Sequence, residues 1–462
     1  MQHLLLPPWP PTYNLTKSTM AQVCFGPTGQ RTPSAPSLTN ATGAFLSKWG
    51  IVALDFESQE AVWSHHSPKD ADTMMVRQAE RIKALAPDTR VWVYRNLAQG
   101  YANFVQLREK LEDPAYSGWW IKFGQHNDPR LTPPCEFNPR LNRTLCSDLF
   151  HTRLAWTEKG HDCGDRIPCG GVLLALECHL PLGLTLSYAC HCTPPSDYVF
   201  DHRNQSLRRW LVEEYFMGRM GMGHAAVEGF LIDDWWTPGG PAEVPHFLQG
   251  TGLVAGSQEI RALQGNWSLT QWEALRQVRA AGGFTWSGFN CMLDTDHAIP
   301  LDTDRAPCGL HKTEGRPRAD NRKDAPIWDP ATSDAGACTA WLRSACSPTS
   351  VFPRIPTLLT FSSQTPPYSG GGPPFAALAQ SITRFLLVRG AYGYMGYGWV
   401  GCVHTPPPTE RYDFDYGEPL ELCHEDTAVP GLFRRRWSKA DASMDCNSFT
   451  PNVTLHGGRR VI

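Results

Sequence analysis

The chain has 462 residues, of which 42 are Lys or Arg, 45 are Asp or Glu, and 19% are charged. This composition excludes a disordered chain, a coiled coil and a collagen, whereas 40 Gly, 39 Pro and 17 Trp are typical of a loop-rich globular protein. The net charge is −3 and no basic stripe is present, so we expect no nucleic-acid partner. We also predict no membrane span, because no apolar stretch approaches the ~20 residues that a spanning helix needs.

Cysteine usage indicates the cellular compartment. Of 15 cysteines, 11 lie between Cys135 and Cys346. Six Asn-x-Ser/Thr sequons accompany them, at Asn14, Asn40, Asn142, Asn204, Asn266 and Asn452. Dense cysteine together with several sequons favours a secreted or secretory-pathway protein with disulfides and N-glycosylation. A cytosolic protein is the alternative.

Short apolar runs recur along the chain, each followed by a turn and a helical pattern. They are enriched in β-branched and aromatic residues, which is typical of strands. The eight predicted strands are Met20–Phe25, Gly50–Phe56, Arg90–Tyr94, Tyr198–Asp201, Val227–Asp233, Gly283–Phe289, Thr357–Phe361 and Gly390–Met395. The predicted helices are Asp70–Leu85, Asn204–Gly218, Leu269–Ala281 and Pro374–Val388, in which apolar residues recur near a 3.6-residue spacing.

Eight strands that alternate with helices predict an α/β fold, a (β/α)8 TIM-type barrel with a parallel sheet. We expect residues 1–17 to form an N-terminal extension, residues 18–429 the barrel, and residues 430–462 a C-terminal tail packed on it. The barrel is expected to carry two long disulfide-rich insertions, at residues 119–196 and 291–350, which hold most of the cysteines.

The most informative candidate site is the run from Val227 to Trp236, where an apolar strand ends in two carboxylates and two indoles. The C-terminal ends of barrel strands are where barrel active sites form. We therefore predict Asp233 and Asp234 as candidate catalytic residues, and Trp235 and Trp236 as flat apolar surfaces for a sugar ring. The alternative is a helix N-cap with core tryptophans.

Further strand ends carry polar or aromatic residues. Asp55 and Glu57 follow the second predicted strand, and Asp201 with Arg203 follows the fourth; we keep all three carboxylates as catalytic candidates. An Asp201–Arg203 ion pair is the alternative for that pair. The predicted substrate-binding residues are Tyr94, Arg95, Asn96, Arg203, Trp235, Trp236, Trp286, Tyr394 and Trp399, although ordinary barrel packing is the alternative for the aromatic ones.

Paired carboxylates are what acetal cleavage requires, because one must protonate the leaving oxygen while the other remains ionised. Other chemistries lack their motifs: the sequence has no phosphate-binding loop, no dinucleotide fingerprint and no Gly-x-Ser-x-Gly elbow. Cys178-His179 and Cys190-His191-Cys192 could be metal ligands, but disulfides explain them better in so cysteine-rich a chain. We predict no metal and no cofactor.

The run Gly-Phe-Leu-Ile-Asp resembles the Asp-Gly-Phe-x-Leu-Asp strand of (β/α)8 glycoside hydrolases, with the final Asp at Asp233 and Glu228 in place of the first Asp. More broadly, the chain resembles an uncharacterised family of secreted glycoside-hydrolase-like barrels of algae, diatoms and oomycetes. The matching segments are residues 18–24, 49–56, 91–96, 200–204 and 229–236. Where that family has Cys-Asp-Cys-Gly, this chain has Cys190-His191-Cys192-Thr193.

The resemblance implies the barrel fold and a carbohydrate as substrate or ligand, with Asp233 as nucleophile or base. The predicted function is therefore a secreted glycoside hydrolase that acts on poly- or oligosaccharides, and a transglycosidase would use the same residues. The alternative from another class is a catalytically inactive carbohydrate-binding barrel of the cell surface or wall.

Overall fold

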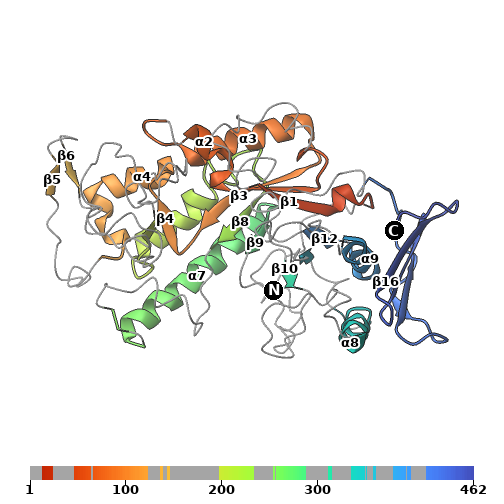
Figure 1. Cartoon of the computed structure of the whole chain (residues 1–462). Coiled ribbons are helices and arrows are strands. Elements are labelled where there is room, and N and C mark those ends of the chain that lie inside the picture. Colours follow the sequence, from red (N-terminus) through yellow and green to blue (C-terminus); the bar gives the residue numbers. More distant parts are fainter. Residues whose placement is uncertain are drawn as a thin grey trace, which may run out of the picture.

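The computed structural model describes residues 13–23, 46–63, 66–122, 136–138, 143–145, 197–233, 253–254, 256–287, 311–314, 335–348, 350, 357–360, 378–391, 393–396 and 413–462. Its central feature is one eight-stranded sheet in the order β10-β11-β12-β1-β2-β3-β8-β9. Several of its strands are labelled near the centre of Figure 1. The strands are β1 (Thr19–Val23), β2 (Ile51–Leu54), β3 (Arg90–Asn96), β8 (Gly229–Asp233), β9 (Phe284–Ser287), β10 (His311–Glu314), β11 (Thr357–Thr360) and β12 (Gly393–Gly396).

Every neighbouring pair in this sheet is parallel. The spatial order follows the chain order from β1 to β9 on one side and from β12 back to β10 on the other. The two end strands, β9 and β10, have Cα atoms within 8 Å of one another. The fold is therefore α/β with a parallel sheet whose ends approach, as the alternating pattern predicts.

One predicted barrel strand is wrong. Tyr198–Asp201 does not enter the eight-stranded sheet, because β7 (Asp197–Val199) pairs antiparallel with β4 (Gln99–Tyr101) in a separate two-stranded sheet. The run Val227–Asp233 therefore contains the fourth strand of the parallel sheet instead of the fifth. The missing sixth strand is β10, within the segment expected to be an insertion, and its sequence His-Lys-Thr-Glu has no apolar residue to mark it. The other seven predicted runs each overlap a strand of the sheet.

Helices separate most of these strands. They are α2 (Glu60–Trp63), α3 (Ala71–Leu85), α4 (Val105–Glu112), α5 (Gln205–Trp210), the π-helical turn η6 (Leu211–Phe216), α7 (Gln258–Ala280), α8 (Ala335–Ala345) and α9 (Leu378–Val388). Single 3-10 turns occur at η1 (Thr16–Ser18), η2 (Phe56–Gln59) and η3 (Pro114–Trp119), and β5 (Glu136–Asn138) pairs antiparallel with β6 (Arg143–Leu145). Among the described helices, none combines the length and the apolar character needed to cross a lipid bilayer.

Helix α7 begins 11 residues before its predicted start at Leu269. The Ser257 side chain accepts a hydrogen bond from the Ile260 backbone N–H and caps the helix there. The interior Gly265 is tolerated because buried apolar side chains on both sides of it, such as Leu263 and Trp267, pack against the core.

Large buried side chains pack on one face of the sheet, which we call the inner face. Trp92 of β3 is fully buried and belongs to the same apolar cluster as Ile51 and Tyr394. Trp92 leaves room only for a glycine on the neighbouring strand: a Cβ atom at Gly229 would lie 2.7 Å from Trp92 Cδ1 and 2.2 Å from the Phe284 carbonyl oxygen. The glycine of the Gly-Phe-Leu-Ile-Asp run is thus a packing requirement.

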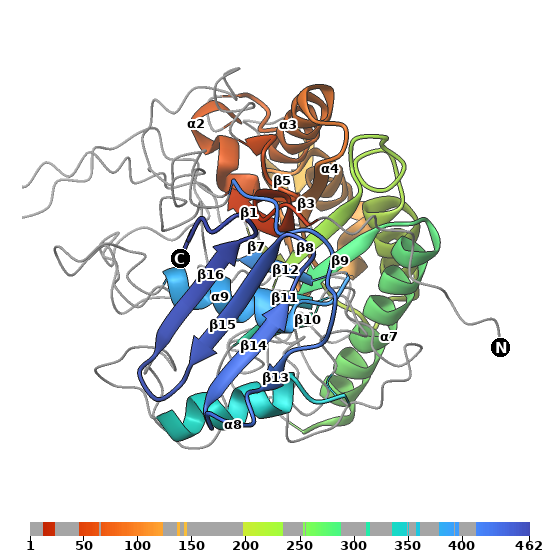
Figure 2. The ribbon, with the colours of Figure 1, turned by 90° about the vertical axis from the view of Figure 1, so that its right-hand side faces the viewer.

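A four-stranded antiparallel sheet forms the C-terminal part, in the order β13 (His424–Glu425), β14 (Leu432–Arg436), β15 (Ala440–Asp445) and β16 (Thr450–Leu455). Its strands β14 to β16 lie across α9 (Figure 2). Two disulfides tie it to α8 and the residue after it, Cys338–Cys446 and Cys346–Cys423. Both join the second predicted insertion to the C-terminal part instead of closing within the insertion. The other cysteines lie outside the described residues.

Candidate functional site

The carboxyl ends of β2, β3 and β8 meet at one edge of the parallel sheet. The register pairs Asn96 with Asp233, the last residues of β3 and β8. On the other side of β3, Leu54 pairs with Val93, which sets Asp55 at the level of Tyr94. Asp55 is buried, with 6% of its surface exposed. Two predicted catalytic carboxylates therefore belong to the strands that flank β3, at the sheet edge where α/β active sites form.

Four side chains form a buried polar cluster at the end of β3, which we call the β3 polar cluster: Tyr94, Asn96, Gln99 and Tyr101. The Asn96 Oδ1 atom accepts from the backbone N–H groups of Ala98 and Gln99 at 2.8 and 2.9 Å. Because a backbone N–H can only donate, the amide orientation is fixed and Nδ2 faces the phenols. Asn96 therefore shapes the turn from β3 into β4.

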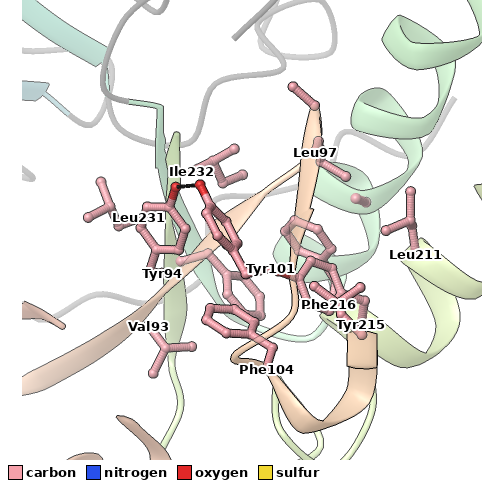
Figure 3. Packing of buried hydrophobic residues seen from close by; sticks show 14 of the residues in the cluster. Val93, Tyr94, Leu97, Tyr101, Phe104, Leu211, Tyr215, Phe216, Leu231 and Ile232 are labelled. Carbon is pink, nitrogen blue, oxygen red and sulfur yellow. Dashed lines mark hydrogen bonds between the residues drawn. The ribbon is translucent and has the colours of Figure 1, made fainter. Parts of the chain in front are cut away.

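Hydrogen bonds join the side chains of the β3 polar cluster. Tyr101 Oη accepts from Asn96 Nδ2 at 3.1 Å and from Gln99 Nε2 at 3.0 Å. The hydroxyl groups of Tyr94 and Tyr101 share a further hydrogen bond at 2.7 Å (Figure 3). Tyr94 Oη also accepts from Asn96 Nδ2 at 3.2 Å.

Aromatic packing holds this cluster in place. Phe56, which follows Asp55, stands 5.0 Å from Tyr94 and 4.9 Å from Tyr101 between ring centroids. Gly100 is required between Gln99 and Tyr101, because a Cβ atom there would lie 2.9 Å from rings of Phe200 and Trp120. The two hydroxyl groups are thus presented by a rigid aromatic wall.

Arg95 does not belong to the site for which it was predicted. Strand alternation turns it to the opposite face of β3, where it is 1% exposed. Its guanidinium donates to the carbonyl oxygens of Tyr94, Tyr215 and Met220 and stacks 4.6 Å from the Tyr215 ring centroid. The Arg95 N–H groups that we expected to bind sugar hydroxyls therefore bind backbone carbonyl groups at the carboxyl end of η6 and just after it.

Asp201 and Arg203 form an ion pair. Arg203 Nε donates to Asp201 Oδ1 at 2.8 Å and Nη2 donates to Oδ2 at 2.7 Å, and this bond raises the pKa of Arg203. Because β7 lies outside the parallel sheet, Asp201 does not end a barrel strand. Both observations favour the ion-pair alternative for Asp201.

His202 lies beside this pair and is fully buried. Its Nε2 is 2.6 Å from the Leu97 carbonyl oxygen, so Nε2 carries the hydrogen, and Nδ1 faces the Thr270 hydroxyl at 3.3 Å. Burial lowers the pKa of His202 to about 4, so the ring is neutral at pH 7. Its bonds link the end of β3 to α7 and leave it no ring nitrogen for catalysis.

Glu228 stands where the glycoside-hydrolase strand motif has its first Asp, and it lies at the amino end of β8. Its carboxylate binds Lys83 at 2.9 Å and Arg90 at 2.6 Å, and it accepts from the Val91 backbone N–H at 3.3 Å. This places Glu228 at the end of the sheet opposite to the candidate site, where it ties β8 to β3 and α3.

The remaining predicted residues are described only in part. For Asp233, Glu57 and Trp286 the structure describes the backbone alone, at the end of β8, within η2 and within β9. Tyr394 is buried in the apolar cluster that contains Trp92 and Ile51, as expected for ordinary packing. Asp234, Trp235, Trp236 and Trp399 lie outside the described residues. Within the described part of the chain, no group of three or more His, Cys, Asp or Glu side chains is arranged for a metal ion.

Gln99 and Tyr101 were not predicted from the sequence. The signal that could have found them is the alternation of Gln99 and Tyr101 soon after an apolar strand, with Gly100 between them in a second short strand.

Comparisons with known proteins place the chain only broadly. No protein-family model matches it, and neither does any curated protein. Among solved structures, it is similar to a trehalose-6-phosphate hydrolase from Bacillus licheniformis (TM-score 0.42, 10% identity), covering 85% of this chain and 64% of that one, less than two thirds of its length. It is also similar to a sucrose 6F-phosphate phosphorylase from Thermoanaerobacter thermosaccharolyticum (TM-score 0.42, 9% identity, 96% and 97% coverage). An alpha-amylase from Anoxybacillus has a TM-score of 0.39 and 11% identity, with 93% and 86% coverage. TM-scores below 0.5 at such identities establish neither the fold nor an activity.

Proposed function

We propose that this protein is a secreted glycoside hydrolase that cleaves a poly- or oligosaccharide at the carboxyl end of a closed (β/α)8 barrel. The observation that carries the proposal is the register between Asn96 and Asp233, with Asp55 on the other side of β3. It brings two carboxylates and a polar cluster to neighbouring strand ends, as acetal cleavage requires. The approach of β9 to β10 supports closure of the barrel.

Asp233 acts as nucleophile or base in this proposal, and Asp55 is the favoured partner. One carboxyl group protonates the leaving oxygen, while the other attacks the anomeric carbon or activates a water molecule. The strands of Asp55 and Asp233 are separated by β3, and neighbouring strands lie ~4.8 Å apart. Asp201 is less suitable because Arg203 holds it as a paired anion.

Tyr94 acts as a positioning residue. Its hydroxyl lies in the β3 polar cluster, and Asp55 stands at the same level beside the adjacent strand, where it would accept the Tyr94 hydrogen. A hydroxyl that donates to a carboxylate favours the ionised form. The cluster thereby keeps one carboxyl group charged while its partner remains available as an acid.

The test begins with a panel of poly- and oligosaccharides and follows with variants on the substrate found. Asp233→Asn should lower turnover on the order of 10³-fold while the protein still folds, because it keeps shape and removes charge. Asp201→Asn is the matched control and should keep most of the activity. Tyr94→Phe should shift the acid limb of the pH–rate profile to higher pH, because the carboxylate loses a donor. If Asp233→Asn keeps more than about a tenth of the turnover, the assignment is wrong.

A catalytically inactive carbohydrate-binding barrel is the contrasting outcome. In that case glycans bind without being cleaved, and Asp233→Asn changes neither result. The proposed secretion rests on the cysteine and sequon content and on the two disulfides. The kinship with secreted barrels of algae, diatoms and oomycetes is proposed on the matching segments 18–24, 49–56, 91–96, 200–204 and 229–236.

A further inference from the structure

Asn452 occupies the outer face of the C-terminal sheet. It lies in β16, the last strand in the order of that sheet, and pairs with Ser443 of β15. The next residue, Val453, is fully buried on the side of α9. Because side chains alternate along a strand, Asn452 and Thr454 both face away from α9.

The two polar residues of this sequon are in contact. Thr454 Oγ1 donates to Asn452 Oδ1 at 3.4 Å. Among the described residues, no hydrogen bond engages Asn452 Nδ2, and both side chains are partly exposed. The hydroxyl that a sequon requires therefore lies beside the amide that would be modified.

We propose that Asn452 carries an N-linked glycan and that Asn204 and Asn266 do not carry one in the folded protein. In the transfer, Asn452 Nδ2 forms a bond to the anomeric carbon of an oligosaccharide linked to a lipid diphosphate. The bond between that carbon and the diphosphate oxygen breaks, the lipid diphosphate leaves, and one Nδ2 proton is released. No contact within the fold has to be broken to accommodate the sugar on the outer face.

Asn204 differs from Asn452 because both polar atoms of its side chain make hydrogen bonds within the protein. Its Oδ1 caps α5 by accepting from the N–H groups of Ser206 and Leu207, and its Nδ2 donates to the Gly118 carbonyl oxygen at 3.1 Å. A Cβ atom on Gly118 would lie only 3.2 Å from that nitrogen, so little space is left for a sugar ring. A glycan on Asn204 would break the contact between α5 and η3.

The sequon at Asn266 differs from that at Asn452 because it lies in a helix. Asn266 lies within α7, and its backbone carbonyl accepts from the Thr270 hydroxyl at 2.8 Å. Residues two apart on a helix are turned by roughly 200° from each other, so a helical sequon separates its asparagine from its hydroxyl residue. In a strand, by contrast, residues two apart share a face, as Asn452 and Thr454 do.

The test is to express the full chain with a secretion leader in a eukaryotic host and to map glycan occupancy of every sequon by peptide mass spectrometry. The secreted protein should carry a glycan at Asn452 in most molecules. Asn452→Gln and Thr454→Ala should each remove the mass of one glycan, whereas Thr454→Ser should keep it. Thr450→Ala, on the same face of the same strand but outside the sequon, is the matched control and should keep it.

If the chain is retained in the cell, the same map is read on its microsomal fraction. An unmodified Asn452 peptide in either pool would overturn the proposal. Occupied Asn204 or Asn266 in folded, secreted protein would overturn the selection among sequons. Neither result depends on hydrolase activity, so this proposal and the proposed function fail separately.

Discussion

Arg435 of β14 donates from Nη1 to the Leu387 carbonyl oxygen at 3.0 Å, inside the last turn of α9. The same nitrogen lies 3.2 Å from the Leu386 oxygen and 2.7 Å from the Arg389 oxygen. Arg435 also stacks 4.5 Å from the centroid of Trp437. A helix leaves its last carbonyl groups without partners, so a side chain of the C-terminal sheet completes α9.

Arg435→Met should therefore destabilise the protein by about 3 kcal/mol or more, because several buried carbonyl groups lose their donor at once. Arg436→Met is the control on the same strand, since Arg436 is exposed and binds Glu421 at the surface. Its effect should stay below about 1 kcal/mol. Chemical unfolding of both variants measures the difference, and equal effects would contradict a capping role for Arg435.

The two disulfides should not act independently. They are nested, with Cys346–Cys423 inside the loop closed by Cys338–Cys446. When one is intact, the other closes only a short loop in the unfolded chain, and short loops restrict that chain less. Removing either pair by Cys→Ser should lower the stability by about 3.5 kcal/mol, which is less than the ~4.5 kcal/mol expected for the same disulfide as the sole cross-link.

Removal of both pairs should then lower the stability by more than the sum of the two single effects. Thermal unfolding of the three variants and the parent gives the coupling. Strict additivity would show that the two loops are closed independently in the unfolded state.

His202 should make the stability depend on pH in a defined window. Its ordinary pKa of 6.5 applies to the unfolded chain, and burial lowers the folded value to about 4. Between pH 6.5 and pH 4 the His202 ring is protonated in the unfolded chain but not in the folded one. The contribution of His202 to the free energy of unfolding is therefore fully present above pH 6.5 and is lost as the pH falls toward 4. The loss should be about 3 kcal/mol, at most ~1.4 kcal/mol per pH unit.

His202→Gln does not titrate, so its stability should change less between pH 7 and pH 4.5 than that of the parent. Because carboxylates contribute equally to both proteins, the difference between the two curves isolates the histidine. Parallel curves would mean that His202 is protonated in the folded state.

Arg95→Lys should lower the stability by about 2 kcal/mol or more, since one ammonium cannot reproduce the fork that binds Tyr94, Tyr215 and Met220. Ligand affinity of the folded protein should be unchanged, because Arg95 faces away from the inner side of the sheet. Calorimetric unfolding and a binding titration separate the two effects. Weakened binding at full stability would return Arg95 to the ligand site.

The elements that the sequence predicts well are those with a strong apolar signal. Ile51–Leu54 and Arg90–Asn96 are buried strands, and their apolar residues show it. Tyr198–Phe200 has the same signal but packs on Trp120 in an antiparallel pair, and a buried run does not reveal its partner. β10 is polar, so only its neighbours could indicate it.

The candidate site follows the same rule. Asp55 and Asp233 were predicted because each ends an apolar run. Gln99 and Tyr101 escaped prediction, because their role depends on hydrogen bonds that form only when β4 folds back beside β3. Arg95 was misassigned for a related reason: η6 covers the face of β3 that carries Arg95, and Tyr215 of η6 lies 120 residues later in the chain.

The pairing of β1 with β12 has a consequence for synthesis on the ribosome. Thr19 of β1 pairs with Met395 of β12, roughly 380 residues later in the chain. At about 5–20 residues per second, that edge of β1 stays unpaired for on the order of 20–75 s while the other strands emerge. An open parallel strand is a template for pairing with other chains. The nascent chain therefore has to be shielded there until the last strand of the parallel sheet is synthesised, which makes β1 the place where co-translational misassembly would begin.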